Sequence, residues 1–264
     1  MRDQINLPQL IIAVCIVITS LSCNSGNQDD QWRTLFNGRN LDGWIPKITH
    51  HKLGDNYAKT FRVEDGKLVV SYDDYEEFNN RFGHLYYQEP FSSYHLKFEY
   101  KFTNQWMEEA PSYANRNSGI MFHAQDPKSI GLEQDWPIAV EYQILAEQEE
   151  GEPRPTANVC TPGTEIMYEG RTYTDHCLNS SSQTYKLDQW IKGELIVRSD
   201  SLITHIINGD TVLQYSKPQI GGGVVENFDP AAKVDGKALK SGYIALQSEG
   251  HGIEFKNIKI KELD

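Results

Sequence analysis

The run Asn117-Ser118-Gly119-Ile120-Met121-Phe122-His123 and the later run Val140-Glu141-Tyr142-Gln143-Ile144 indicate how this chain folds. Apolar and polar side chains alternate along both runs with a period of two, which is typical of β-strands. The polar positions carry Asn, His, Glu and Gln, whereas a solvated sheet face usually carries Lys, Thr and Ser. This composition favours a polar ligand on that face, and an ordinary solvated face is the alternative.

Strand signals recur along the rest of the chain, and no long stretch has helical periodicity. Asp65-Gly66 and Asn208-Gly209 each separate two strand-like segments, as expected for tight β-hairpins. In the last segment the apolar positions change parity at Lys256-Asn257, which predicts a β-bulge there. We therefore expect an all-β, antiparallel sandwich or jelly roll. The strand-like segments are 61–64, 67–70, 94–102, 194–199, 201–207, 210–215, 242–248 and 253–260.

The first two dozen residues have the pattern of an export signal. The apolar run 10–18 is too short to span a hydrocarbon core of about 30 Å, and small residues then lead to Cys23. This resembles a bacterial lipoprotein signal, with residues 1–22 removed, Cys23 lipidated and 23–31 as a flexible tether to a domain at 32–264. A plainly cleaved signal and a retained membrane anchor are the alternatives. The expected location is the periplasm or the outer membrane or cell surface of a Gram-negative bacterium.

Cysteine usage agrees with export. Cys15 and Cys23 lie in the expected signal, which leaves Cys160 and Cys177 in the domain. Two cysteines in an oxidising compartment usually pair. A zinc site is the alternative, but no CxxC spacing supports it. We therefore expect a disulfide between Cys160 and Cys177.

Charge narrows the class of ligand. The formal net charge is -12 at pH 7, and the chain has no basic run. Nucleic-acid binders need clustered Lys and Arg, so this class is excluded, and a polyanionic substrate is disfavoured. A neutral oligosaccharide or glycoside fits best. The segment 221–237, which begins with three glycines, is expected to be a mobile insertion at the rim of the sandwich.

Several motifs in order resemble those of the 3-keto-disaccharide hydrolase-like domain family, from about Trp32 to the C-terminus. The resemblance implies a concanavalin-like (LamG-like) jelly roll that cleaves glycosides already oxidised to a ketone at C3. A non-catalytic, glycan-binding lipoprotein of the same fold is the alternative. The matching motifs are Leu35-Phe36-Asn37-Gly38-Arg39-Asn40-Leu41-Asp42-Gly43-Trp44, Phe61-Arg62-Val63-Glu64-Asp65-Gly66, Asn117-Ser118-Gly119-Ile120, Glu141-Tyr142-Gln143-Ile144, Gly242-Tyr243-Ile244-Ala245-Leu246-Gln247-Ser248-Glu249-Gly250 and Phe255-Lys256-Asn257-Ile258.

A ketone at C3 acidifies the hydrogen on C2, so the oxygen on C1 can leave by elimination and water can then add to the enone. Such a reaction needs a base, an acid and a group that stabilises the enolate oxygen, either a divalent metal ion or fixed donors. We expect His123, Glu141 and His176 to act in catalysis, since an imidazole suits a base near neutral pH. A metal ion, if one binds, would be held by Glu141, His123 and Gln143.

The other candidate residues lie on the polar strands and in adjoining loops. Glu249 follows a strand, and a hydrogen bond to the backbone is its alternative role. His176 has a structural role as its alternative, and His205 is otherwise a buried, hydrogen-bonded imidazole. The aromatic residues Trp106, Tyr113 and Trp136 are either platforms for a sugar ring or part of the core. The expected substrate-binding residues are Asn117, Gln143, Arg116, Trp106, Glu249 and His205.

Overall fold

The central strand of the larger sheet is β6 (Ser93–Trp106), in which every second side chain from Tyr94 to Phe102 is buried. The intervening residues, from His95 to Lys101, are partly exposed on the outer face. This alternation indicates that one face of β6 packs on the core of a sandwich and that the other face is turned to solvent. The computed structural model describes Met1 and residues 32–264, so the expected signal, Cys23 and the tether lie outside the described residues.

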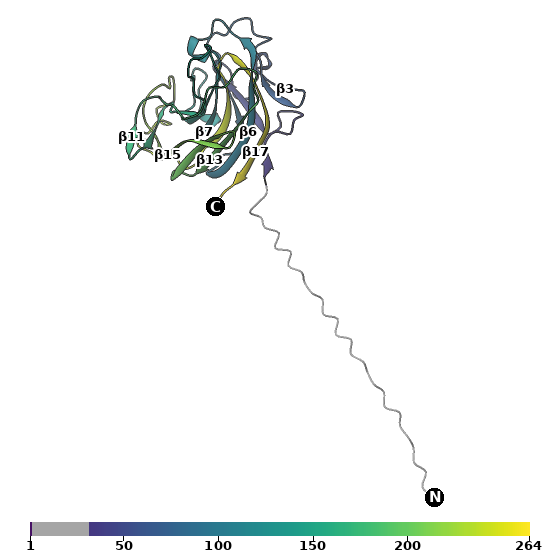
Figure 1. The fold of residues 1–264 in the computed structure, drawn as a ribbon, viewed down its shortest axis with the longest axis vertical. Coiled ribbons are helices and arrows are strands. Elements are labelled where there is room, and N and C mark those ends of the chain that lie inside the picture. Colours follow the sequence, from purple (N-terminus) through teal and green to yellow (C-terminus); the bar gives the residue numbers. More distant parts are fainter. Residues whose placement is uncertain (2–31) are drawn as a thin grey trace. The chain divides into compact units, whose positions relative to one another are not determined.

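The larger sheet has ten strands in antiparallel pairs, with β6 between β13 and β17 (Figure 1). Its order is β11-β10-β15-β14-β13-β6-β17-β4-β3, and β1 also pairs with β17. Its strands are β1 (Arg33–Thr34), β3 (Phe61–Glu64), β4 (Lys67–Val70), β6, β10 (Thr164–Tyr168), β11 (Arg171–Tyr173), β13 (Ile191–Arg198), β14 (Leu202–Ile207), β15 (Asp210–Ile220) and β17 (His251–Glu262).

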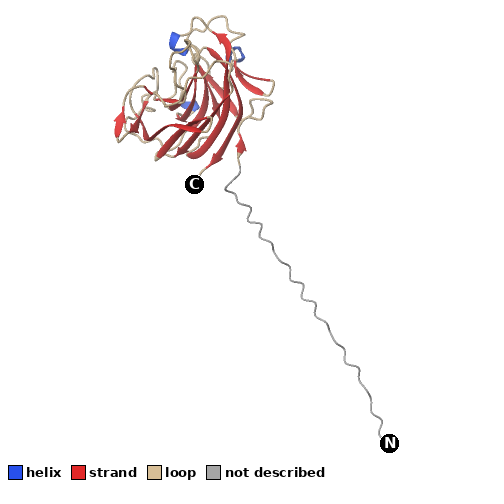
Figure 2. Cartoon of the chain, viewed as in Figure 1, coloured by secondary structure: helices blue, strands red, loops and turns tan. Residues whose placement is uncertain are grey.

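The smaller sheet has seven antiparallel strands in the order β12-β9-β8-β7-β16-β5-β2. Its strands are β2 (Trp44–Ile48), β5 (Gly83–Tyr87), β7 (Asn117–Ala124), β8 (Val140–Leu145), β9 (Asn158–Cys160), β12 (Cys177–Leu178) and β16 (Tyr243–Ser248). The helices of the described part are three short 3-10 turns, drawn in blue in Figure 2: η2 (Tyr57–Lys59), η3 (Ser112–Ala114) and η4 (Pro127–Ser129). None of the helices in residues 32–264 has the length and apolar character needed to cross a bilayer.

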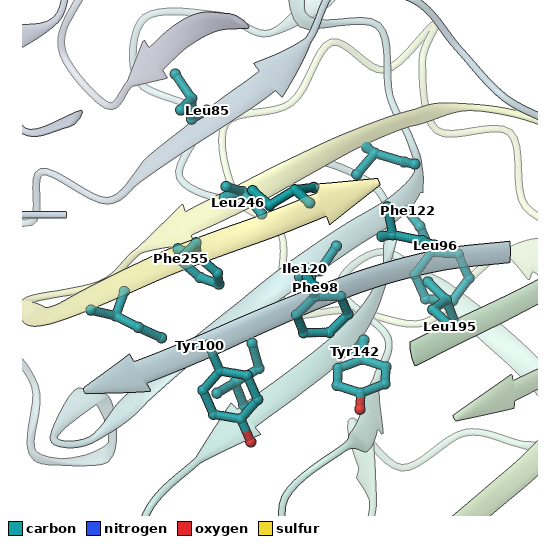
Figure 3. Close-up of a cluster of buried hydrophobic side chains, with 14 of the residues drawn as sticks. Leu85, Leu96, Phe98, Tyr100, Ile120, Phe122, Tyr142, Leu195, Leu246 and Phe255 are labelled. Carbon is teal, nitrogen blue, oxygen red and sulfur yellow. The ribbon is translucent and has the colours of Figure 1, made fainter. Parts of the chain in front are cut away.

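The core lies between the inner faces of the two sheets. Phe98 of β6 packs edge to face on Tyr142 of β8, with ring centroids 5.4 Å apart, and both are buried (Figure 3). Ile120 and Phe122 of β7 join the same cluster, so the apolar halves of the two alternating runs face inward as predicted. The all-β sandwich expected from the sequence is confirmed.

The local predictions about turns and the bulge are also confirmed. Asp65 and Asn208 have positive φ angles of 49° and 51° and are followed by glycines, as two-residue hairpin turns require. The pairing of β17 with β6 shifts between Lys256 and Lys259, and Asn257 has a φ of 54°. The extra residue brings Ile258 and Ile260 back to the core face.

Candidate active site

The outer face of the smaller sheet carries polar side chains from adjacent strands. In the pairing of β7 with β8, Gly119 lies opposite Gln143 and Met121 lies opposite Glu141. On the other side of β8, Glu141 pairs with Cys160 of β9. Because alternate residues of a strand point to the same face, Glu141 and Gln143 project away from the core that contains Tyr142.

A cavity of ≈ 430 Å³ opens on this face. A volume of this size is in the range of small-ligand sites in proteins. The loops after β6, β7, β8, β9, β11, β15 and β16 supply its walls, while β7 and β8 supply its floor. The lining residues are Tyr113, Asn117, Trp136, Glu141, Gln143, Leu145, Arg154, Pro162, His176, Cys177, Val224 and Glu249.

Glu141 lies at the floor of the cavity with 5% of its surface exposed. Its side chain crosses the neighbouring strand at Gly119, where an added Cβ would collide with the carboxyl group. Burial raises the pKa of Glu141 to about 8. A carboxyl group with this pKa can accept or give up a proton near neutral pH.

Glu249 is a second buried carboxyl group in the same cavity. Burial raises its pKa well above the usual range, the charge of Glu141 raises it further, and the positive charge of Arg154 lowers it. The Oε2 atom of Glu249 is buried and has no hydrogen-bond partner among residues 32–264. Two such carboxyl groups cannot both ionise easily, so the pair retains at least one proton into the alkaline range.

Arg154 is held in place by the backbone. Its guanidinium donates to the carbonyl oxygens of Arg116 and Ala146 through Nη1, at 3.2 and 2.9 Å, and to that of Asn115 through Nη2, at 3.0 Å. These contacts leave its positive charge fixed at the cavity wall, beside Glu249.

Two amide side chains complete the polar floor. Asn117 donates from Nδ2 to the carbonyl oxygen of Tyr113 at 3.2 Å, and its buried Oδ1 has no hydrogen-bond partner in the described part of the chain. Gln143 accepts from Nδ2 of Asn158 at 3.0 Å through Oε1, which orients the amide. Buried polar atoms are normally satisfied, so the free Asn117 oxygen points to a ligand hydroxyl or an ordered water.

His176 lies at the cavity wall next to the predicted disulfide, which is present between Cys160 and Cys177. Its backbone carbonyl accepts from the N–H and the hydroxyl of Thr161, at 2.9 and 3.1 Å. Although His176 is exposed, the surrounding protein partly desolvates its ring and lowers its pKa, so the imidazole is neutral around pH 7. A neutral imidazole at this position can take up a proton from a ligand.

His123 lies outside this cavity, which corrects the expectation that it joins Glu141. The pairing of β7 with β16 shifts at Phe122 and His123, and His123 has a φ of 46°. Alternation breaks at this bulge. Its Nε2 hydrogen-bonds to the carbonyl of Ser199 at 3.1 Å, and the residue lines a separate cavity of ≈ 490 Å³ beside Asp126.

Three other residues expected to bind the ligand do not line this cavity either: Arg116, Trp106 and His205. The guanidinium of Arg116 donates to the carbonyls of Glu147 and Gln148, so the residue braces a loop. Trp106 packs on His251 at the edge of the core, with ring centroids 5.7 Å apart.

His205 is fully buried, and its ring nitrogens hydrogen-bond to the carbonyl of Ala157 and the hydroxyl of Tyr215. It is therefore the satisfied core histidine that we gave as the alternative.

The three metal ligands expected from the sequence do not lie together. Glu141 and Gln143 line one cavity, whereas His123 lines another. Within residues 32–264, the group of three potential ligands that lies close enough consists of Cys160, His176 and Cys177. Its two sulfur atoms are joined in the disulfide. The residues present therefore do not fit the expected metal set.

Sequence reasoning missed Arg154 and Val224. Arg154 lies between two prolines in the loop after β8, and nothing in its local sequence distinguishes it from a surface residue. Val224 belongs to the glycine-rich segment 221–237, in which the next residue, Val225, is buried in a cluster with Ile138 and Ile220. Trp136 and Tyr113, which we considered as platforms, both line the cavity.

Comparisons with known structures agree with the fold. Two crystal structures of candidate glycosyl hydrolases from Parabacteroides distasonis ATCC 8503 are 19% identical to this chain, with TM-scores of 0.53 and 0.54. The first comparison covers 88% of this chain and 94% of that one, and the second covers 89% and 100%.

The exoplasmic/lumenal domain of VIP36, in a form bound to Ca²⁺ and Man3GlcNAc, is 9% identical with a TM-score of 0.51. That comparison covers 89% of this chain and 91% of that one. The comparison with curated proteins found no match.

A family model described as the 3-keto-alpha-glucoside-1,2-lyase-like domain matches residues 31–261. This match spans nearly all of the described residues, and the two-sheet sandwich is the fold that the resemblance implied. The chain therefore belongs to the 3-keto-disaccharide hydrolase-like family, whose model carries that description.

Proposed function

We propose that this domain cleaves glycosides whose sugar carries a ketone at C3, by elimination across C2 and C1. The observation that carries the proposal is the pair of buried carboxyl groups, Glu141 and Glu249, in one cavity with the fixed charge of Arg154. Above about pH 8, where Glu141 has lost its proton and Glu249 keeps its own, they supply one carboxylate and one carboxylic acid. The reaction needs this combination, since one proton leaves C2 while another must reach the departing oxygen.

The carboxylate of the pair removes the C2 proton, and the electrons move into the ketone to form an enolate. As the enolate collapses, the bond from C1 to its oxygen breaks, and the carboxylic acid of the pair protonates that oxygen. The products are an alcohol and an enone, and addition of water to the enone completes a net hydrolysis. His176, neutral and at the cavity wall, is a second candidate for the base.

The enolate oxygen needs a fixed positive charge or hydrogen-bond donors. Arg154 supplies the charge, and its three backbone contacts keep it from reorienting during the reaction. The amide of Gln143, held through its oxygen by Asn158, presents its nitrogen as a donor. Asn117 Oδ1 accepts from a sugar hydroxyl and orients the ring.

A non-catalytic glycan-binding role is the second candidate. Its support is the free acceptor of Asn117 beside the aromatic side chains Trp136 and Tyr113, since amides and aromatic rings are common in sugar-binding sites. We also propose that the protein is exported and lipid-anchored through Cys23. Incorporation of a labelled fatty acid, lost on Cys23→Ser, tests this part separately.

The test of function is product release from a 3-keto-glucoside and from its unoxidised parent, using protein without residues 1–23. We expect turnover of the keto form alone, and a loss of about a hundredfold or more in kcat for Glu141→Gln and Glu249→Gln. Glu64→Gln, on the exposed end of the first hairpin, is the matched control. Binding of the sugar without turnover would favour the glycan-binding role instead.

A further inference from the structure

The mouth of the candidate active site is apolar and open to solvent, in contrast to its floor. Tyr113 has 54% and Val224 51% of its surface exposed, and both line the cavity. The other large apolar side chains that are exposed in residues 32–264, Leu132, Leu202 and Val234, are not among its lining residues. Two solvent-exposed apolar side chains from separate loops thus meet at one cavity.

Val224 is also in a strained backbone conformation. Its φ is 67°, in the left-handed region that a β-branched side chain strongly disfavours. A glycine would adopt this conformation without strain, yet the valine directly follows three glycines. Strained residues that persist in a fold are concentrated at functional sites.

Neighbouring residues hold both side chains in position. Val225 is buried against Ile138 and Ile220, which fixes the segment that carries Val224. The carbonyl of Tyr113 accepts from the side chain of Asn117, which ties the loop carrying Tyr113 to the polar floor. The apolar mouth is therefore a preformed surface of the site.

We infer that the leaving group of the substrate is apolar, with an aromatic or aliphatic aglycone seated between Tyr113 and Val224 while the sugar occupies the polar floor. This inference rests on the proposed function and narrows its substrate class. A second sugar as leaving group would place hydroxyls against the side chains of Val224 and Pro162, which offer no hydrogen-bonding partner. An apolar aglycone would instead cover exposed apolar surface, which is favourable.

The test compares benzyl and methyl 3-keto-glucosides, because benzyl and methyl alcohol leave with similar chemical ease. We expect the wild-type protein to prefer the benzyl glycoside by about tenfold or more in kcat/KM. Val224→Gly and Tyr113→Ser should each remove most of this preference. Val234→Gly, from the same segment but outside the cavity lining, should retain it.

Val224→Gly also separates the inference from a loss of folding. Because glycine tolerates a positive φ, this variant should be at least as stable as the wild-type protein while it loses the benzyl preference. Equal kcat/KM for the two glycosides, or a preference that survives both substitutions, would overturn the inference.

If neither glycoside is turned over, the proposed function fails instead, and calorimetric binding of the two glycosides then decides the inference. Tighter binding of the benzyl form that depends on Val224 would support an apolar subsite, and equal binding would reject it.

Discussion

The side chain of Glu141 occupies the space that a side chain at Gly119 would fill. An added Cβ at Gly119 would collide with Oε1, Cδ and Cγ of Glu141. The φ of Gly119 is not positive, so glycine is required here for the space it leaves and not for a backbone conformation that only glycine adopts. The glycine of the first polar run thus determines where the carboxyl group of the second run lies.

Gly119→Ala should displace the carboxyl group of Glu141 and lower kcat by at least about tenfold, while the two sheets remain folded. Circular dichroism and turnover of the 3-keto substrate measure the two effects separately. Gly223→Ala, at a glycine with no heavy atom within 4 Å of an added Cβ, is the control. Full activity in Gly119→Ala would show that the position of the Glu141 carboxyl group does not matter.

Glu141→Gln should make the protein more stable at alkaline pH. Folding raises the pKa of Glu141 to about 8, from an ordinary value of about 4.3. The folded state therefore binds more protons between these values, and this group's contribution to stability falls as the pH rises through that window. Gln does not titrate, so its advantage should be absent below about pH 4 and reach several degrees in Tm at pH 8.

Thermal unfolding of Glu141→Gln, Glu64→Gln and wild-type protein at pH 4, 6 and 8 measures this effect. A difference between Glu141→Gln and wild type that does not change with pH would mean that Glu141 is not a desolvated carboxyl group in the folded protein.

Arg154→Met should lower stability and shift the pH profile of activity. Three backbone carbonyls lose their donor, which should cost roughly 2–4 kcal/mol. Without the nearby positive charge, the pKa of Glu249 should rise, so the alkaline limb of the pH–rate profile, where the proton donor loses its proton, should move to higher pH. Arg154→Lys keeps a positive charge at this position, so it should reverse part of the shift seen in Arg154→Met. An unmoved limb in a destabilised Arg154→Met protein would limit Arg154 to a structural role.

Removal of the disulfide should destabilise the domain and loosen the wall of the site. The bond joins residues separated by 17 positions, and the loss of its constraint on the unfolded chain should cost about 3 kcal/mol. Because His176 precedes Cys177, we expect Cys160→Ser with Cys177→Ser to raise KM as well. Urea unfolding and steady-state kinetics check the two effects. A loss of stability without a change in KM would separate the disulfide from substrate binding.

The parts of the fold that could be predicted from sequence are those set by neighbours along the chain. Alternation identified β7 and β8, two-residue turn motifs identified the hairpins, and a change of parity located the bulge at Asn257. The same alternation placed Glu141, Gln143 and Asn117 in one cavity, because β7 and β8 are adjacent in the sheet.

The residues that sequence reasoning misplaced depend on contacts between distant parts of the chain. His123 turns away where β7 meets β16, and an added Cβ at Gly242 would collide with its backbone. Arg154 reaches the site because a loop folds back onto the carbonyls of Asn115 and Arg116. Neither event leaves a periodic signal in the sequence.

The side chains of two adjacent residues of β8 point to opposite faces of the sheet: Tyr142 packs in the core and Glu141 lies in the candidate active site. A slip of this strand by one position would bury the carboxyl group among aromatic rings and turn the tyrosine outward. The packing of Tyr142 in the core therefore also keeps Glu141 on the face of the sheet that carries the site. Insertions should consequently be tolerated in the surrounding loops and eliminated within 140–145, so that substrate preference can diverge among relatives while the reacting groups stay in register.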